Sequence, residues 1–271
     1  MKRTIALLLA LVMVFALCAC GKTTNSAGGD TNDVADGKTY TIKIACENSD
    51  NYPATLGLYA MEKYVESHTN GAVQVEVCAS GQLGGEEDTL EQVAQGNLEM
   101  AVASFAPVVS YVPEFEVMDI PFVYNSYEEA WLVLDSYVGT DLLAAMEKYG
   151  LKGMAFMENG FRQVTSSQGA IDNMDSFKNL KIRTMQNNNH MAFWTAIGAE
   201  PTPLAWAEVY FALQSGTIDA EENAADTCVG ASFQEVQKYL QDKNQHICFH
   251  KYIFLCNLFD RILSNQIQLK I

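Results

Sequence analysis

The chain has 271 residues, 49% of them hydrophobic and 10% aromatic, so it can bury the core of one large domain or two modest ones. Lysine and arginine total 17 against 33 aspartate and glutamate residues, which gives a formal net charge of −16. Such a chain repels nucleic acid and anionic membrane surfaces. Nucleic-acid binding is therefore excluded, and the few arginines become informative about where an anion binds.

The N-terminus has the pattern of a bacterial export signal. Lys2 and Arg3 precede an apolar run over residues 5–17, which is too short to cross a bilayer as a mature helix. The run ends in LCACG, which resembles a lipobox. We therefore expect a signal peptide over residues 1–19 and lipid attachment at Cys20, with a plain signal peptide cut nearby as the alternative.

The chain after the signal divides by composition. Residues 20–38 are rich in Gly, Asn, Asp and Thr and predict a flexible tether. Alternating strand-like and helix-like patterns follow over residues 39–240. In chain order the first predicted elements are a strand from Tyr40, a helix from Pro53 to about His68 and the strand AVQVEV. A helix from Glu86 to Gln95 and the strand LEMAVAS come next. The last element of this half is a helical stretch that begins with a capping box at Ser126 and Glu129 and reaches Tyr149.

The alternation continues in the second half of this region. The predicted elements are short strands at Gly153–Met157 and Arg162–Ser166, a brief helix capped by Asp175, the strand LKIRT, helices at Asn188–Ile197 and Ala205–Gly216, and the strand TIDAEE. Strands that alternate with helices predict an α/β fold with a mostly parallel sheet.

Several motifs in this region resemble one protein family together. They are SGQLGGEEDTLEQVAQGNLEMA, EFEVMDIPFVY, NGFRQVTSS, FKNLKIRTM, IGAEPTPLAWAEVYFALQSGTIDAEEN and FQEVQKYL. In this order and spacing they resemble the solute-binding subunits of TRAP transporters, the DctP family. The resemblance implies a two-lobed fold of the periplasmic-binding-protein type II class that closes on a small organic acid. It also implies delivery to a small and a large integral membrane subunit.

The same resemblance implies a set of ligand-binding residues. Arg183, in the KxR motif, matches the arginine that pairs with the substrate carboxylate, and a guanidinium fork fits carboxylate geometry. Arg162 matches a second arginine near the anion, with a structural role as the alternative. Asn223 matches a ligand-facing amide, although the preceding Ala220 and Glu221 stand where the family has Gly and Gln.

Further candidates are weaker. Trp206 matches an aromatic residue of the pocket wall, with a core position as the alternative, and Gln186 is a candidate polar contact. Glu47 follows the first strand and would determine specificity if it points inward, because it would repel a carboxylate and accept from a hydroxyl or amine. Ser104 stands where some sugar-acid binders have a glutamate, which argues against sialic acid.

Other classes of function have little support in the sequence. The seven cysteines include no C-x-x-C pair and the four histidines form no motif, so no metal or cofactor is expected. An exported enzyme that uses paired carboxylates is one alternative, but nucleophile-elbow, zinc-protease and phosphate-loop motifs are lacking. A binding protein of an ATP-driven importer is another, and the NLKIR and AWAEVY motifs favour the TRAP type.

The C-terminal segment departs from the family pattern. After Leu240 the chain reads QDKNQHICFHKYIFLCNLFDRILSNQIQLKI, where the family continues into a long run of helices. We therefore expect residues 241–271 to be a divergent, truncated tail with those helices missing, although KYIFLCNLFD still resembles the expected strand and helix start. A non-binding remnant is the alternative that this expectation leaves open.

Overall fold

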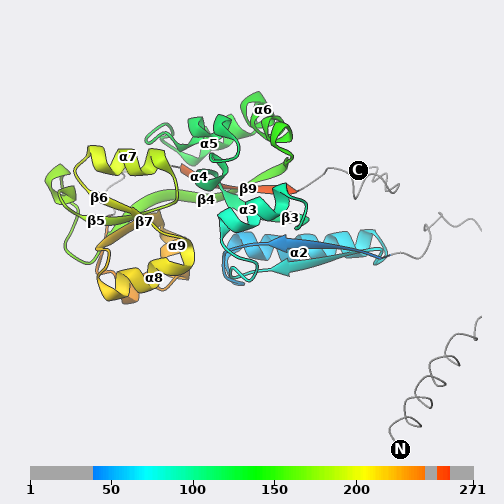
Figure 1. The fold of residues 1–271 in the computed structure, drawn as a ribbon, viewed down its shortest axis with the longest axis horizontal. Coiled ribbons are helices and arrows are strands. Elements are labelled where there is room, and N and C mark those ends of the chain that lie inside the picture. The colour runs from blue at the N-terminus through cyan, green and yellow to red at the C-terminus, as the bar shows by residue number, and fades with distance from the viewer. Residues whose placement is uncertain (1–38, 242–248, 257–271) are drawn as a thin grey trace, which may run out of the picture. The chain divides into compact units, whose positions relative to one another are not determined.

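The first lobe is an α/β layer structure built on one half of a nine-stranded sheet. The computed structural model describes residues 39–241 and the backbone of residues 249–256 (Figure 1). This half has the strand order β2-β1-β3-β9-β4. The bounds are β1 Tyr40–Ala45, β2 Val73–Cys78, β3 Met100–Ser104, β9 Phe249–Cys256 and β4 Lys152–Ser166. β1 pairs in parallel with β2 and β3, whereas β9 is antiparallel to β3 and β4.

Both faces of this half-sheet are covered. Helix α2 (Pro53–His68) connects β1 to β2 and confirms the predicted β-α-β unit. Ile44 packs in a core with Leu58 of α2, while the next residue, Ala45, packs in a second core with Leu90 of α3 (Glu86–Ala94). Consecutive strand residues point to opposite faces, so one apolar strand supplies both cores.

The predicted helical stretch up to Tyr149 is divided into three elements. They are α5 (Tyr127–Leu134), α6 (Tyr137–Ala145) and a 3₁₀ helix (Met146–Tyr149). Ser126 caps α5 as predicted, and its hydroxyl accepts from the Glu129 backbone N–H at 3.2 Å. Ser136 caps α6 in the same way, so the single-helix prediction was wrong. The short α4 (Phe105–Val108) and a 3₁₀ helix (Pro113–Asp119) precede these elements.

One long strand joins the two lobes. The two short strands predicted at Gly153–Met157 and Arg162–Ser166 are a single strand, β4, which runs through both halves of the sheet in Figure 1. Its pairing with β9 shifts register between Glu158 and Gly160, and Gly160 has φ 114°. The separate-strand prediction was wrong because the polar Glu-Asn-Gly sequence forms a bulge inside the strand and does not end it.

The second lobe repeats the layered arrangement on the other half of the sheet, β4-β7-β5-β6. Its strands are β5 (Lys181–Thr184), β6 (Glu200–Pro203), β7 (Ala220–Ala224) and the short β8 (Tyr239–Leu240). Its helices are α7 (Asn188–Ala196), α8 (Trp206–Ser215), α9 (Ala225–Gly230), and 3₁₀ turns at Met174–Phe177 and Phe233–Glu235. β5 pairs in parallel with β6 and β7.

Local signals explain most of the second lobe. Gly216 ends α8 in the left-handed conformation (φ 72°), as the sequence predicts. The brief helix after residue 173 is capped by Asn173, whose side chain accepts from the Asp175 backbone N–H at 2.9 Å. The prediction that Asp175 is the cap was therefore wrong by two residues. β6 was not predicted, because a prolyl residue at each second position hides its strand character.

Several sequence predictions lie outside the described residues. They concern the signal peptide, Cys20, the tether, residues 242–248 and residues 257–271. The backbone of residues 249–256 forms β9, which is the strand expected within KYIFLCNLFD. No helix among the described residues is long and apolar enough to span a bilayer. Cys46, Cys78 and Cys228 are buried free thiols.

Candidate functional site

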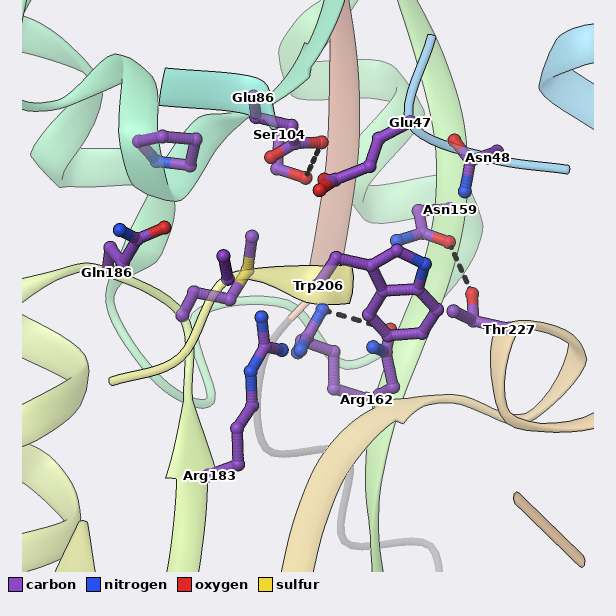
Figure 2. A pocket seen from close by; sticks show the side chains of 14 residues that line it. Glu47, Asn48, Glu86, Ser104, Asn159, Arg162, Arg183, Gln186, Trp206 and Thr227 are labelled. Atoms are coloured by element: carbon purple, nitrogen blue, oxygen red, sulfur yellow. Dashed lines mark hydrogen bonds between the residues drawn. The ribbon is translucent and has the colours of Figure 1, made fainter. Parts of the chain in front are cut away.

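A polar cavity of about 40 Å³ lies between the two lobes. It has contributions from the ends of β1 and β3, the start of α3, and strands β4, β5 and β7. A wider cavity of about 490 Å³ adjoins it and shares part of its lining, namely Glu47, Asn48, Ala205, Trp206 and Thr227. Figure 2 shows the inner cavity with acidic side chains on the first-lobe side and guanidinium groups on the second-lobe side.

Arg183 is the main cation of this cavity. It lies on β5 with 3% of its surface exposed, and its Nε and Nη2 donate to the Leu204 carbonyl at 3.0 and 2.8 Å. This contact holds the side chain in place and leaves the Nη1 and Nη2 end of the fork directed at the cavity (Figure 2). Among the described residues Arg183 forms no ion pair. A buried guanidinium without a counter-charge is costly, so the site is built to receive an anion.

Arg162 also lines the cavity, but its charge is already compensated. It lies on β4 with 1% of its surface exposed and forms a buried ion pair with Glu222 of β7. Its Nη2 donates to Glu222 Oε1 at 3.1 Å, and its Nη1 donates to Asn223 Oδ1 at 3.1 Å. These contacts support a positioning role for Arg162, which was the alternative in the sequence analysis.

Asn223 and Trp206 both belong to the lining of the cavity. Asn223 Oδ1 accepts from Arg162 and from the Ala224 backbone N–H at 3.0 Å, so the amide N–H₂ is the group left for a ligand. Trp206, the first residue of α8, has its ring centroid 5.9 Å from the Arg183 guanidinium carbon and 5.5 Å from the Phe233 ring. Trp206 thus contributes both to the wall of the cavity and to the core of the second lobe.

Gln186 lies at the cavity edge and connects the lobes. Its Nε2 donates to Glu87 Oε2 of α3 at 2.7 Å. The neighbouring Asn187 donates to the Ala106 carbonyl and to Asp119 Oδ2, both at 3.0 Å. All three acceptors belong to the first lobe, so the turn that follows β5 is a hydrogen-bonded bridge between the lobes.

The first-lobe side of the cavity contains two carboxyl groups, Glu47 and Glu86. Burial and repulsion from Glu86 raise the pKa of Glu47 to about 8, although Arg183 opposes the shift. Burial raises the pKa of Glu86 to about 7, and the Ser104 hydroxyl, which donates to its Oε1 at 2.8 Å, opposes that shift. Sequence analysis missed Glu86, because a glutamate in the first turn of a helix is ordinary.

Glu221, which the sequence analysis singled out as a departure from the family pattern, does not line the cavity. It is fully buried on β7, where its Oε1 accepts from the Thr165 hydroxyl at 3.3 Å and from Cys228 Sγ at 3.2 Å. Its Oε2 is buried without a hydrogen-bond partner. Burial raises the pKa of Glu221 to about 7. Glu221 therefore belongs to the core next to the site, while Asn223 belongs to the cavity lining.

The described residues contain no cluster of His, Cys, Asp and Glu side chains that is suited to a metal ion. The groups that converge on the cavity are two buried guanidinium groups, amides, an indole ring and two carboxyls. Such a set can bind and orient a small polar molecule by hydrogen bonds. Two α/β lobes joined by the long strand β4, with such a cavity between them, define the class of two-lobed binding proteins.

Comparison with known proteins identifies the family. The family model described as bacterial extracellular solute-binding protein, family 7 (DctP), matches residues 44–265. A solute-binding protein of Verminephrobacter eiseniae is 34% identical over 224 residues, which are 82% of this chain and 66% of that protein. This chain belongs to the DctP family of extracellular solute-binding proteins. It spans 54% to 66% of the length of curated relatives that it matches.

Solved structures agree in fold. The sugar-acid-binding protein DctPAm of Advenella mimigardefordensis, in complex with galactonate, matches with a TM-score of 0.78 and 32% identity over 82% of this chain and 71% of that one. A TRAP periplasmic solute-binding protein of Sulfurospirillum deleyianum with bound succinate has a TM-score of 0.78 and 31% identity over 81% and 70% of the two chains. The two-lobed α/β fold predicted from the sequence is therefore confirmed.

Proposed function

We propose that this protein is an extracytoplasmic solute-binding lipoprotein that captures a small organic acid and delivers it to a TRAP-type transporter. The observation that carries the proposal is Arg183, a guanidinium with 3% exposure that lines the inter-lobe cavity and has no ion pair among the described residues. A carboxylate at the free end of its fork accepts two charge-assisted hydrogen bonds. The proposal takes further support from relatives that are named solute-binding proteins.

The other side chains of the cavity have secondary roles in this proposal. The Asn223 amide donates to the bound acid, and Trp206 covers its carbon skeleton. Arg162 orients Asn223 through the 3.1 Å contact and adds positive potential at longer range. Gln186 acts at the lobe bridge. No step here breaks a covalent bond, so the proposed function is binding and release and is not catalysis.

The anchor and the transporter complete the proposal. Cys20, directly after the predicted signal peptide, is the proposed site of lipid attachment, and residues 20–38 are the proposed tether. Expression with a labelled fatty acid should label the chain at Cys20, and a Cys20→Ala variant that keeps the label would exclude this anchor.

Ligand titration of the full chain in detergent tests the proposed capture. We expect calorimetry against a panel of small mono- and dicarboxylates to find an acid whose binding is lost on Arg183→Ala, with a decrease in affinity of about tenfold or more. Arg183→Lys should recover only part of the affinity, because a lysine offers a point charge in place of a fork.

Lys181→Ala is the matched control for this experiment. Lys181 lies on the same strand, two residues before Arg183, and is exposed. The Lys181→Ala substitution removes one positive charge without altering the cavity, so the affinity of this variant for the acid should stay close to that of the wild type. If a folded chain binds no acid in an Arg183-dependent manner, the proposed function is wrong.

A further inference from the structure

The inter-lobe cavity has two walls of opposite charge. Arg183 belongs to the second-lobe wall, and Glu47 and Glu86 form the opposite one, which we call the acidic wall (Figure 2). Glu47 lies two residues after β1, and Glu86 is the first residue of α3 beside the end of β3. Both carboxyls thus lie at the carboxyl ends of parallel strands, where α/β sheets bind their ligands.

The acidic wall makes no ion pair with any lysine, arginine or histidine of the described residues. Within the part of the chain that the structure describes, neither Glu47 nor Glu86 makes an ion pair, and Ser104 is the residue that donates hydrogen bonds to the Glu86 carboxyl. Their remaining oxygens therefore face the cavity. Two carboxyls that share a buried site hold protons in common. With the pKa of Glu47 near 8 and that of Glu86 near 7, the pair retains a proton at neutral pH.

The charge of this wall restricts what a bound acid carries beyond its carboxylate. A second carboxylate would lie against the acidic wall, and juxtaposed like charges are strongly unfavourable. A methylene chain would leave the wall without hydrogen bonds, which is also unfavourable. A hydroxyl group both donates and accepts, so it matches a pair that holds one proton between several acceptor oxygens.

The shape of the cavity is consistent with a ligand that extends past this wall. The inner cavity of about 40 Å³ has room for a carboxylate and little more, whereas the adjoining cavity of about 490 Å³ begins at Glu47. That outer cavity is lined by polar and glycine-rich turns that include Ser80, Gly84 and Gly85. A chain that leaves the inner cavity therefore passes the acidic wall and enters the outer cavity, where the polar side chains of Ser80 and Asp88 stand beside the apolar Trp206 and Ala231.

We propose that the acidic wall of Glu47 and Glu86 makes this protein select a hydroxylated monocarboxylate over a dicarboxylate of the same length. The inference rests on the proposed function, because Arg183 must hold the single carboxylate while the wall receives the hydroxyl groups. It narrows the ligand from small organic acids in general to those with hydroxyl groups beyond one carboxylate.

Four-carbon probes of matched length test this selection. The full chain is titrated by calorimetry at pH 7 with D-erythronate, succinate, butyrate and 4-aminobutyrate. We expect D-erythronate to bind at least about tenfold more tightly than succinate, because only succinate places a second anion at the wall. Glu47→Gln and Glu86→Gln should reduce the ratio of the affinity for D-erythronate to that for succinate, mainly by increasing the affinity for succinate. Glu91→Gln, exposed on the same helix as Glu86, is the control and should leave the ratio unchanged.

The possible outcomes separate the two proposals. If succinate or butyrate binds as tightly as D-erythronate and Arg183→Ala abolishes both, capture through Arg183 stands and the selective role of the acidic wall is wrong. Tightest binding of 4-aminobutyrate would mean that the wall receives an ammonium group, which also overturns the inference. Binding that does not change in Arg183→Ala contradicts the proposed function itself.

Discussion

Glu221 shows how one residue can link the site to stability. It is buried on β7 with an unpartnered Oε2, and its register partner on β5 is Arg183. Burial is the main cause of its raised pKa, and Glu222 adds to it, while Arg162, Arg183 and the Cys228 hydrogen bond act in the opposite direction. The neutral acid is therefore the form that the folded protein prefers below about pH 7.

This preference predicts a pH-dependent gain in stability for Glu221→Gln. The pKa of Glu221 rises from its ordinary value of 4.5 to about 7 on folding, so the folded state binds more protons between these values and stability falls as pH rises through that window. Glutamine removes this dependence. In urea unfolding, the variant should gain on the order of 1–3 kcal/mol over the wild type at pH 8 and much less at pH 5.

Glu200→Gln provides the comparison for this measurement. Glu200 is exposed at the start of β6, so its loss should not change the pH dependence. An equal stability difference for Glu221→Gln at pH 5 and pH 8 would show that Glu221 is ionised in the folded protein at both values, contrary to this account.

The residues of the cavity differ in how far the sequence predicts them. Arg183 was predictable because it lies in a specific motif and few arginines compete with it in an acidic chain. Glu86 was not predictable as a cavity residue, because an acidic residue in the first turn of a helix is already explained by its favourable interaction with the helix dipole. Arg162 was found, but its pairing with Glu222 depends on the β4–β7 register, which no local pattern contains.

The elements were predicted well where local signals are strong and less well where two elements meet. The divided helix after Ser126 is an example, since Ser136 is itself a good N-cap residue. A Cβ at Gly139 would lie 1.8 Å from the Leu134 carbonyl oxygen, so the close approach of α6 to the end of α5 requires glycine there. Because apolar periodicity continues across this break, the sequence pattern alone predicts one helix.

Strand β4 shows the same limit, because its bulge lies at the crossing between lobes. Gly160 has φ 114°, and a Cβ there would lie 3.3 Å from the Ala224 Cβ of β7. Gly160→Ala should therefore destabilise the protein by about 1–3 kcal/mol in urea unfolding. Gly169→Ala, where the added Cβ meets nothing within 4 Å, should be close to neutral. Similar stabilities of the two variants would mean that the bulge relaxes without cost.

At the scale of the whole 39–241 region, the cavity depends on how the lobes are held together. The turn after β5 provides two bridges, from Gln186 to Glu87 and from Asn187 to Ala106 and Asp119. Asn187 also caps α7, since its Oδ1 accepts from the Asn189 and His190 backbone N–H groups at 2.8 and 3.2 Å. The same amide thus orders the second lobe with its oxygen and contacts the first lobe with its nitrogen.

These two roles can be separated by Asn187→Asp. Aspartate caps a helix as well as asparagine does, so α7 is kept, but the donor to Ala106 is lost and a second carboxyl faces Asp119. Looser lobes populate the binding-competent arrangement less, which weakens apparent affinity by the same factor. We expect the dissociation constant for D-erythronate to rise on the order of tenfold and the radius of gyration of the ligand-free chain, from X-ray scattering, to increase.

Asn173→Asp makes the same substitution at an exposed cap within the second lobe and should change neither quantity. Weaker binding without any change in the radius of gyration would place the effect of Asn187 within the cavity and not in the bridge between the lobes.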